Sequence, residues 1–114
     1  MIDDEAVAAL AALAHEDRLR AFRLLVKAGP GGLASGEIAQ ALDIAPTRMS
    51  FHLAGLERSC LVETRRDGRR IIYSMCSGAM RDLLTFLTQD CCNGRPEICG
   101  GLGNLAERLE RRGC

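Results

Sequence analysis

The hydrophobic period of this chain changes at Leu61, and this change restricts the fold more than any other feature. Before it, apolar side chains recur at helical spacing and predict a helix over 46–59, with an inner face of Met49, Leu53 and Leu56. After it, the runs VETRR and RRIIYSM alternate with a period of two and are separated by Asp67-Gly68. Asp-Gly between two such runs predicts a β-hairpin, because both central residues of the favoured turn need positive φ. A helix followed directly by a two-stranded hairpin is therefore expected.

Three further helical patterns precede residue 46. An alanine- and leucine-rich pattern covers 3–13. A second helix, which carries an apolar stripe, is expected to begin at Glu16 or Asp17 and to stop at the glycines of Gly29-Pro30-Gly31-Gly32. Ser35 is a suitable N-cap for a third, short helix over 36–42, which a tight turn joins to the helix that opens at Pro46.

Two short helices joined by a tight turn outline a helix-turn-helix. A last helix is expected from Ala79 to about Asp90, where apolar residues return to helical spacing. The predicted fold class is mainly α with a two-stranded β wing (α+β), a winged helix-turn-helix.

Length and composition narrow the class of protein. With 114 residues one domain is the default. The net charge is zero, yet four arginines fall at the expected hairpin tip, so a local basic patch lies on a neutral body. No apolar stretch reaches the roughly 20 residues that cross a bilayer, and the acidic start is unlike a signal peptide. We expect a cytoplasmic protein without a membrane partner.

The helix over 46–59 has a polar outer face that suits the major groove of double-stranded DNA. Arginine can bind guanine O6 and N7 through two donors, and phenylalanine can touch a thymine methyl. The hairpin arginines would meet the phosphate backbone or the minor groove. The predicted DNA-contacting residues are Thr47, Arg48, Ser50, Phe51, His52, Arg65, Arg66, Arg69 and Arg70. The plainer alternative is an ordinary surface helix and an ordinary solvated hairpin, which would leave an exposed phenylalanine unexplained.

From residue 5 to 90 the chain resembles the ArsR/SmtB family of metalloregulatory repressors. The segments PTRMSFHLAGLE and LVETRRDGRRIIYSM carry the resemblance, with Ser50, His52 and Leu53 at the family's spacing and Leu61-Val62 entering the wing. The resemblance implies a homodimer built mainly from the first and last helices, which represses transcription from an imperfect inverted repeat. Cys60 is a departure, because family members often have glycine where the recognition helix closes.

Family members place their inducer sites in different parts of one scaffold. The segment LASGEIAQAL lacks the cysteine box of one arsenic-sensing branch, and neither His15 nor His52 lies on the last helix, where zinc and cobalt regulators hold metal. The segment DCCNGRPEIC resembles a further arsenic-sensing branch. As(III) takes three thiolates, whereas structural zinc normally takes four ligands. Residues 1–90 are thus expected to bind DNA and dimerise, and 91–114 to carry the inducer site at Cys91, Cys92 and Cys99.

The expected function is a repressor that leaves its operator when As(III) or Sb(III) binds, with no permanently bound cofactor. A thiol-based redox or reactive-sulfur sensor of the same fold is the main alternative. The three cysteines could also be incidental, and whether Cys114 is a fourth thiol stays open. Cys60 and Cys76 lie in apolar sequence surroundings and are expected to be buried.

Two further classes of protein fit less well. A thiol enzyme would need a Cys-x-x-Cys at a helix start or a cysteine in an anion-binding loop, and neither spacing occurs, so no enzyme is expected. A winged-helix module that binds only protein would leave the arginines and Phe51 unexplained.

Overall fold

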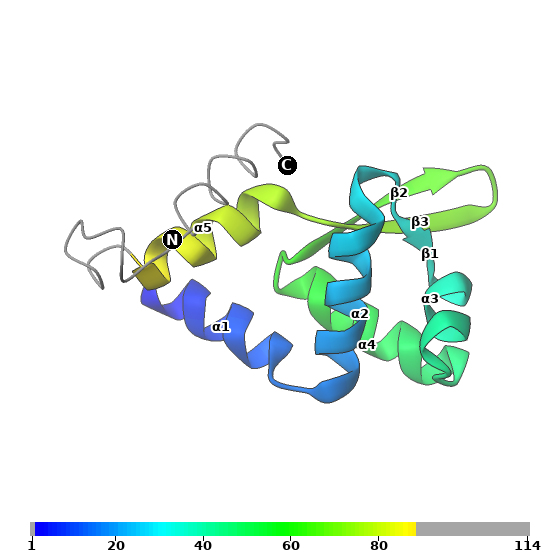
Figure 1. The fold of residues 1–114 in the computed structure, drawn as a ribbon, viewed down its shortest axis with the longest axis horizontal. Helices are drawn as coiled ribbons and strands as arrows, with labels where there is room; N and C mark the ends of the chain where they lie inside the picture. Colours follow the sequence, from blue (N-terminus) through cyan, green and yellow to red (C-terminus); the bar gives the residue numbers. More distant parts are fainter. Residues whose placement is uncertain (1, 89–114) are drawn as a thin grey trace.

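The computed structural model describes residues 2–88, and these form the predicted winged helix-turn-helix (Figure 1). The elements in chain order are α1 (Asp3–Leu13), α2 (Glu16–Ala28), the short 3-10 helix η1 (Gly29–Gly31), β1 (Leu33–Ala34), α3 (Ser35–Leu42), α4 (Pro46–Arg58), β2 (Val62–Asp67), β3 (Arg70–Met75) and α5 (Ser77–Thr88). The predicted helices and the wing are confirmed, although α5 begins two residues earlier than expected. Among the described residues, no helix is long and apolar enough to cross a membrane.

The core lies where α2 packs against α3 and α4. The predicted inner face of α4, Met49, Leu53 and Leu56, is fully buried, together with Leu25 of α2 and Ile38 of α3. Burying a side chain of this size contributes roughly 1.5–3 kcal/mol. The helices α1 and α5 lie side by side at the end of the molecule away from the wing (Figure 1). This arrangement leaves the opposite face of α4 at the surface.

The wing is a three-stranded antiparallel sheet in the order β1-β3-β2. Strand β1 was not predicted, because two residues carry no period. It also shifts the start of α3: Ala34 stays extended as the N-cap while Ser35, the predicted N-cap, is the first helical residue. The backbone N–H of Ala34 donates to Glu37 Oε1 at 2.9 Å, so a side chain from inside the helix caps it.

The hairpin turn is shifted by one residue from the prediction. Asp67 pairs with Arg70, so the two central turn residues are Gly68 and Arg69. Gly68 has φ 65°, whereas Arg69 is not in the positive-φ region. This glycine-first pattern is that of a type II′ hairpin turn, in which only the first central residue needs positive φ. The expectation of positive φ at Asp67 was therefore wrong.

Helix α4 closes in the geometry that usually employs glycine. The N–H of Cys60 bonds Glu57 O at 3.0 Å and the N–H of Leu61 bonds Leu56 O at 3.1 Å, which together form a Schellman motif. Cys60 occupies its left-handed position with φ 61° and is exposed. The expectation that Cys60 is buried was wrong, because the residue that closes a helix in this way points away from the core.

Candidate nucleic-acid interface

Helix α4 exposes the face that the sequence predicted for DNA. Thr47, Arg48, Ser50 and Phe51 are all exposed, on the side of the helix opposite the buried leucines. The Phe51 side chain is 61% exposed, which is high for a phenylalanine on an otherwise polar face. These four residues form what we call the reading face of α4.

His52 differs from the reading face, because it is only 5% exposed. Its Nδ1 accepts a hydrogen bond from Nε of Arg18 at 3.2 Å, and its Nε2 lies 3.5 Å from Oδ2 of Asp17. Burial lowers the pKa of His52, and the charge of His15 adds to this, while Asp17 opposes it. In this structure a neutral His52 links α4 to α2 beneath the surface, and its contact with DNA stays a prediction.

Asp17, in the first turn of α2, joins two residues of α4. Its Oδ2 lies 3.0 Å from Nε of Arg48 and 3.5 Å from Nε2 of His52, which is one helical turn further along. The Arg20 guanidinium lies 3.9 Å from the other carboxylate oxygen. Sequence reasoning missed this role of Asp17, because an acidic residue in a first helical turn is explained by the helix dipole alone.

Arg18, the next residue, extends the same connection along α4. Its guanidinium lies 5.9 Å from the centre of the Phe51 ring, within the range of a cation–π contact. A Cβ at Gly55 would lie 3.0 Å from Arg18 Cζ, so this glycine leaves room for the arginine. Asp17 and Arg18, two consecutive residues of α2, therefore contact both the reading face and the buried His52 beneath it.

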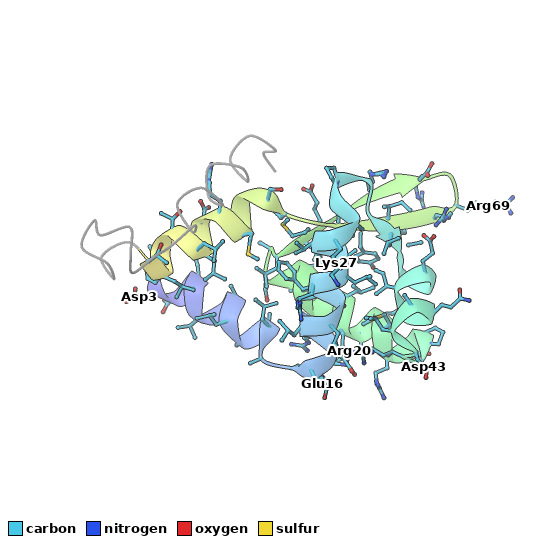
Figure 2. All side chains as sticks on the ribbon, viewed as in Figure 1. Asp3, Glu16, Arg20, Lys27, Asp43 and Arg69 are labelled. Atoms are coloured by element: carbon cyan, nitrogen blue, oxygen red, sulfur yellow. The ribbon has the colours of Figure 1, made fainter. Side chains whose placement is uncertain are left out.

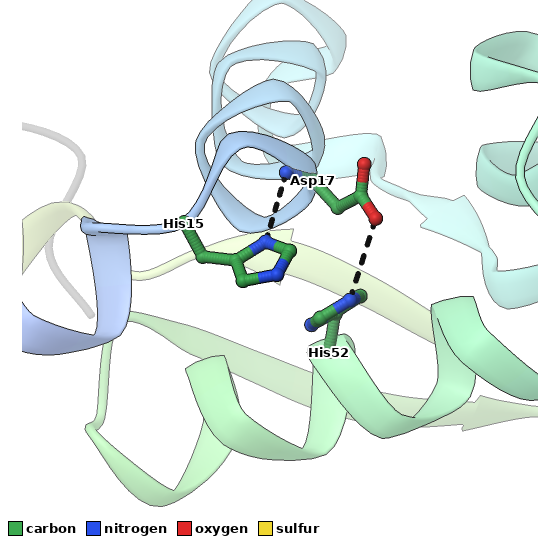
Figure 3. Close-up of side chains that lie close together, drawn as sticks. All are labelled: His15, Asp17 and His52. Carbon is green, nitrogen blue, oxygen red and sulfur yellow. Dashed lines mark hydrogen bonds and ion pairs between the residues drawn. The ribbon is translucent and has the colours of Figure 1, made fainter.

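The side chains of His15, Asp17 and His52 lie close together and include atoms of the kind that bind metal ions (Figure 3). Their ligand atoms lie within 4.8 Å of one another. However, Nδ1 of His15 accepts from the backbone N–H of Asp17 at 3.1 Å, and Nδ1 of His52 accepts from Arg18. Both Nδ1 atoms thus accept hydrogen bonds, whereas a histidine that binds a metal through Nε2 carries a proton on Nδ1 and donates it. The cluster is better explained as a hydrogen-bond network.

The wing arginines fall into two pairs. Arg65 donates from Nη2 to Gly31 O at 2.7 Å, and Arg70 forms an ion pair with Glu37 of α3. Within residues 2–88, no carboxylate pairs with Arg66 or Arg69. Figure 2 shows Arg69 at the hairpin tip, pointing away from the body. Arg66 and Arg69 can thus reach a phosphate without breaking an ion pair, whereas Arg65 and Arg70 are held by the protein.

Comparison with known proteins places the fold in a family. A helix-turn-helix domain family matches residues 13–65. The transcriptional activator HlyU of Vibrio cholerae is 31% identical over 88 residues, which cover 77% of this chain and 79% of HlyU. The solved structure of reduced HlyU has 31% identity and a TM-score of 0.57, over 74% of this chain and 88% of that one.

Two solved structures supply the family name. One is the homodimeric winged helix-turn-helix domain of Mb0332 from Mycobacterium bovis, described as a possible ArsR-family regulator, with 28% identity and a TM-score of 0.62 over 81% of this chain and 83% of that one. The other, a possible transcriptional regulator for arsenical resistance, has 25% identity and a TM-score of 0.62 over 71% and 81%. This chain belongs to the ArsR family. It is a transcriptional regulator with a DNA-binding helix-turn-helix, and the named relatives are regulators rather than enzymes.

For an ArsR-family protein the positions of the thiols matter. Cys60 is a free, exposed thiol at the end of α4. Cys76, just before α5, is half-buried and disulfide-bonded, so the expectation that it is buried was wrong for this residue too. The predicted inducer ligands Cys91, Cys92 and Cys99 lie outside the described residues. In agreement with the sequence, α3 contains no cysteine, and neither His15 nor His52 lies on α5.

Proposed function

We propose that this ArsR-family protein is a homodimeric repressor that leaves an inverted-repeat operator when As(III) or Sb(III) binds Cys91, Cys92 and Cys99. The observation that carries the proposal is the position of this triad in the chain. It begins three residues after Thr88, the last residue of α5, and α5 packs on α1. A ligand bound by these thiols would act on the segment that follows α5 in the sequence, and α1 and α5 are the helices that the family uses to dimerise.

Exposed apolar side chains on α1 and α5 support the dimer. Ile2, at the N-cap of α1, and Val7 are each more than 60% exposed, and Leu10 and Leu87 of the same two helices are also exposed. Large apolar side chains at the surface of adjacent helices mark an interface when they form a patch. The homodimeric Mb0332 domain is an example among similar structures. A two-fold dimer would present two reading faces to successive major grooves.

The choice of As(III) depends on ligand number. Three thiols within nine residues match the three thiolates of trivalent arsenic or antimony, whereas a closed zinc site would need a fourth ligand. The similarity to a possible regulator for arsenical resistance points the same way. Release requires the metalloid to bind the DNA-free conformation more tightly, and a difference of about 3 kcal/mol would weaken operator binding more than a hundredfold.

A second candidate function is a thiol redox switch of the same fold. It is favoured by one observation, the disulfide-bonded Cys76 at the start of α5. Oxidation at the base of this helix could alter the dimer as a bound metalloid would. Redox chemistry would, however, respond to an oxidant and not to arsenite under reducing conditions.

Fluorescence anisotropy on a duplex from the protein's own promoter separates these functions. The reduced protein is bound to the duplex, and As(III), Sb(III), Zn(II), Cd(II) or peroxide is added in turn. We expect release at stoichiometric As(III) or Sb(III), and loss of this response when Cys91, Cys92 or Cys99 is changed to serine. Cys60→Ser is the matched control, because it removes an exposed free thiol outside the triad. An intact complex at stoichiometric As(III) contradicts the proposal, and release by peroxide alone supports the redox function.

A further inference from the structure

We propose that Asp17 is a positioning residue that holds Arg48 in the orientation needed to bind one guanine of the operator. The inference rests on the proposed contact of Arg48 with DNA and names the residue that determines its precision. Asp17 belongs to α2 and needs no contact with DNA for this role. It acts through the side chain of Arg48.

The contact occupies one edge of the guanidinium and leaves the other free. Asp17 Oδ2 lies 3.0 Å from Nε of Arg48, and the Arg48 side chain is still 57% exposed. Guanidinium has five N–H donors in a rigid plane, so an ion pair at Nε fixes the plane while the terminal Nη1 and Nη2 groups can still donate. Guanine O6 and N7 accept two such donors side by side. The geometry therefore orients Arg48 without blocking it.

Asp17 is itself held in place, which a positioning residue must be. Its side chain is only 13% exposed, and the oxygen that meets Arg48 also meets His52, whose other ring nitrogen is bound by Arg18. An arginine on an exposed helix face otherwise loses much side-chain freedom when it binds a base. A carboxylate that His52 and Arg20 hold in place removes part of that cost before DNA arrives.

The opposite role, in which Asp17 withholds Arg48 from DNA, fits the surroundings less well. A withheld arginine would be covered, whereas Arg48 is more than half exposed. Arg20 and Arg48 contact the Asp17 carboxylate, and Arg18 donates to His52 beside it, so these three arginines and one carboxylate together carry a positive charge. Phosphates would be attracted to such a cluster and not repelled.

The experiment selects duplexes from a random-sequence library with the full-length protein and its variants. Arg48→Ala should abolish the preference for one guanine in each half-site, a discrimination of roughly tenfold or more. Asp17→Ala and Asp17→Asn should weaken the preference at the same guanine by several-fold and leave the other positions unchanged. The matched control is Glu16→Gln, which removes a neighbouring exposed carboxylate at the same end of α2 (Figure 2).

A chemical readout separates positioning from a merely structural role. The identified guanine is replaced by 7-deazaguanine, which lacks the N7 acceptor. The wild type and Glu16→Gln should lose several-fold in affinity, whereas Arg48→Ala and the Asp17 variants should lose little, because their contact with N7 is already weakened. A structural defect would lower affinity for both duplexes equally.

The outcomes keep the two proposals apart. If the wild type selects no sequence, DNA reading by this face is contradicted. If Arg48→Ala has the same base preference as the wild type, the contact of Arg48 with guanine is contradicted. If Arg48→Ala loses the preference for the guanine and both Asp17 variants keep that preference, only the positioning role is overturned. Tighter binding by Asp17→Ala with unchanged base preference also overturns it, in favour of withholding. Asp17→Asn keeps the size of the side chain and serves as the test if the alanine variant unfolds.

Discussion

Arg18 of α2 donates from Nε to Nδ1 of the buried His52 of α4 at 3.2 Å, across 34 residues of sequence. The hydrogen bond requires an unprotonated Nδ1, because an imidazolium has no lone pair to offer. It therefore connects the protonation state of one histidine to the packing of the reading helix on its support.

Stability should fall as the pH decreases from 7.5 to 5.5. The pKa of His52 is lowered in the folded protein, so below its ordinary value of 6.5 the unfolded chain binds a proton that the native state refuses. The contribution of His52 to stability is fully present above pH 6.5 and is lost as the pH falls toward the pKa of His52 in the folded protein. Urea unfolding at several pH values measures it, and His52→Gln should flatten the dependence in this window. An equally steep dependence in that variant would assign the effect to another group.

Cys60→Gly should stabilise the protein by about 0.5 to 1 kcal/mol. A side chain in the left-handed region crowds the following carbonyl, and glycine removes this strain while giving back part of the gain through its freedom in the unfolded chain. Cys60→Ala is the control, because it removes the thiol and keeps the strain. Urea midpoints of the reduced proteins give the comparison. Equal stability of the two variants would mean that the backbone at residue 60 is relaxed.

Gly32→Ala should destabilise the protein by roughly 2 kcal/mol or more. Gly32 has φ 67°, and a Cβ there would overlap the Tyr73 carbonyl and lie 2.8 Å from Ile72 Cγ2, so β1 could not stay paired with β3. Gly36→Ala is the matched control in α3, where a Cβ meets nothing within 4 Å and helix propensity favours alanine by up to about 1 kcal/mol. The midpoint temperature of thermal unfolding should fall for Gly32→Ala and rise for Gly36→Ala. A change in the same direction for both variants would contradict the requirement for glycine at residue 32.

Arg69→Ala should weaken operator binding without changing base preference. Its side chain points away from the hairpin tip and has no carboxylate partner in the described part of the chain, so we expect it to neutralise one phosphate. The slope of log affinity against log salt should become shallower by about 0.9. Arg23→Ala on α2 removes an exposed arginine from another surface and should leave the slope unchanged. A lost base preference in Arg69→Ala would instead indicate a contact with a base edge.

The sequence predicted those parts of the fold that repeat a pattern. The inner face of α4 and the two runs on either side of the Asp67-Gly68 turn signal extend over enough residues to give a pattern, and the helix and both strands are confirmed. Burial along β2 does not alternate, because only Val62 of that strand is buried. The two residues of β1 give none. The hairpin register was missed by one residue because Asp67-Gly68 and Gly68-Arg69 both fit a two-residue turn, and the buried pair Val62 and Met75 decides between them.

The exposure of the reading face was predictable because its residues lie on one side of one helix. The contacts that α2 makes with this helix could not be predicted, because Asp17 and Arg18 reach α4 only through the tertiary packing of α2. At the start of a helix both look like ordinary solvated charges. His52 was assigned to the DNA face on its position in the helix, and only its burial reveals the connection to α2.

The connection from α2 to α4 limits how a signal can reach DNA. Asp17 and Arg18 fasten the reading helix to its neighbour through an ion pair and a hydrogen bond, so turning α4 alone would break both at once. Each subunit of the proposed dimer then moves as one rigid body, in which α4 cannot rotate separately from α2. Under the proposed function, an inducer would then alter the spacing between the two rigid subunits of the dimer, and with it the fit of both to a single operator.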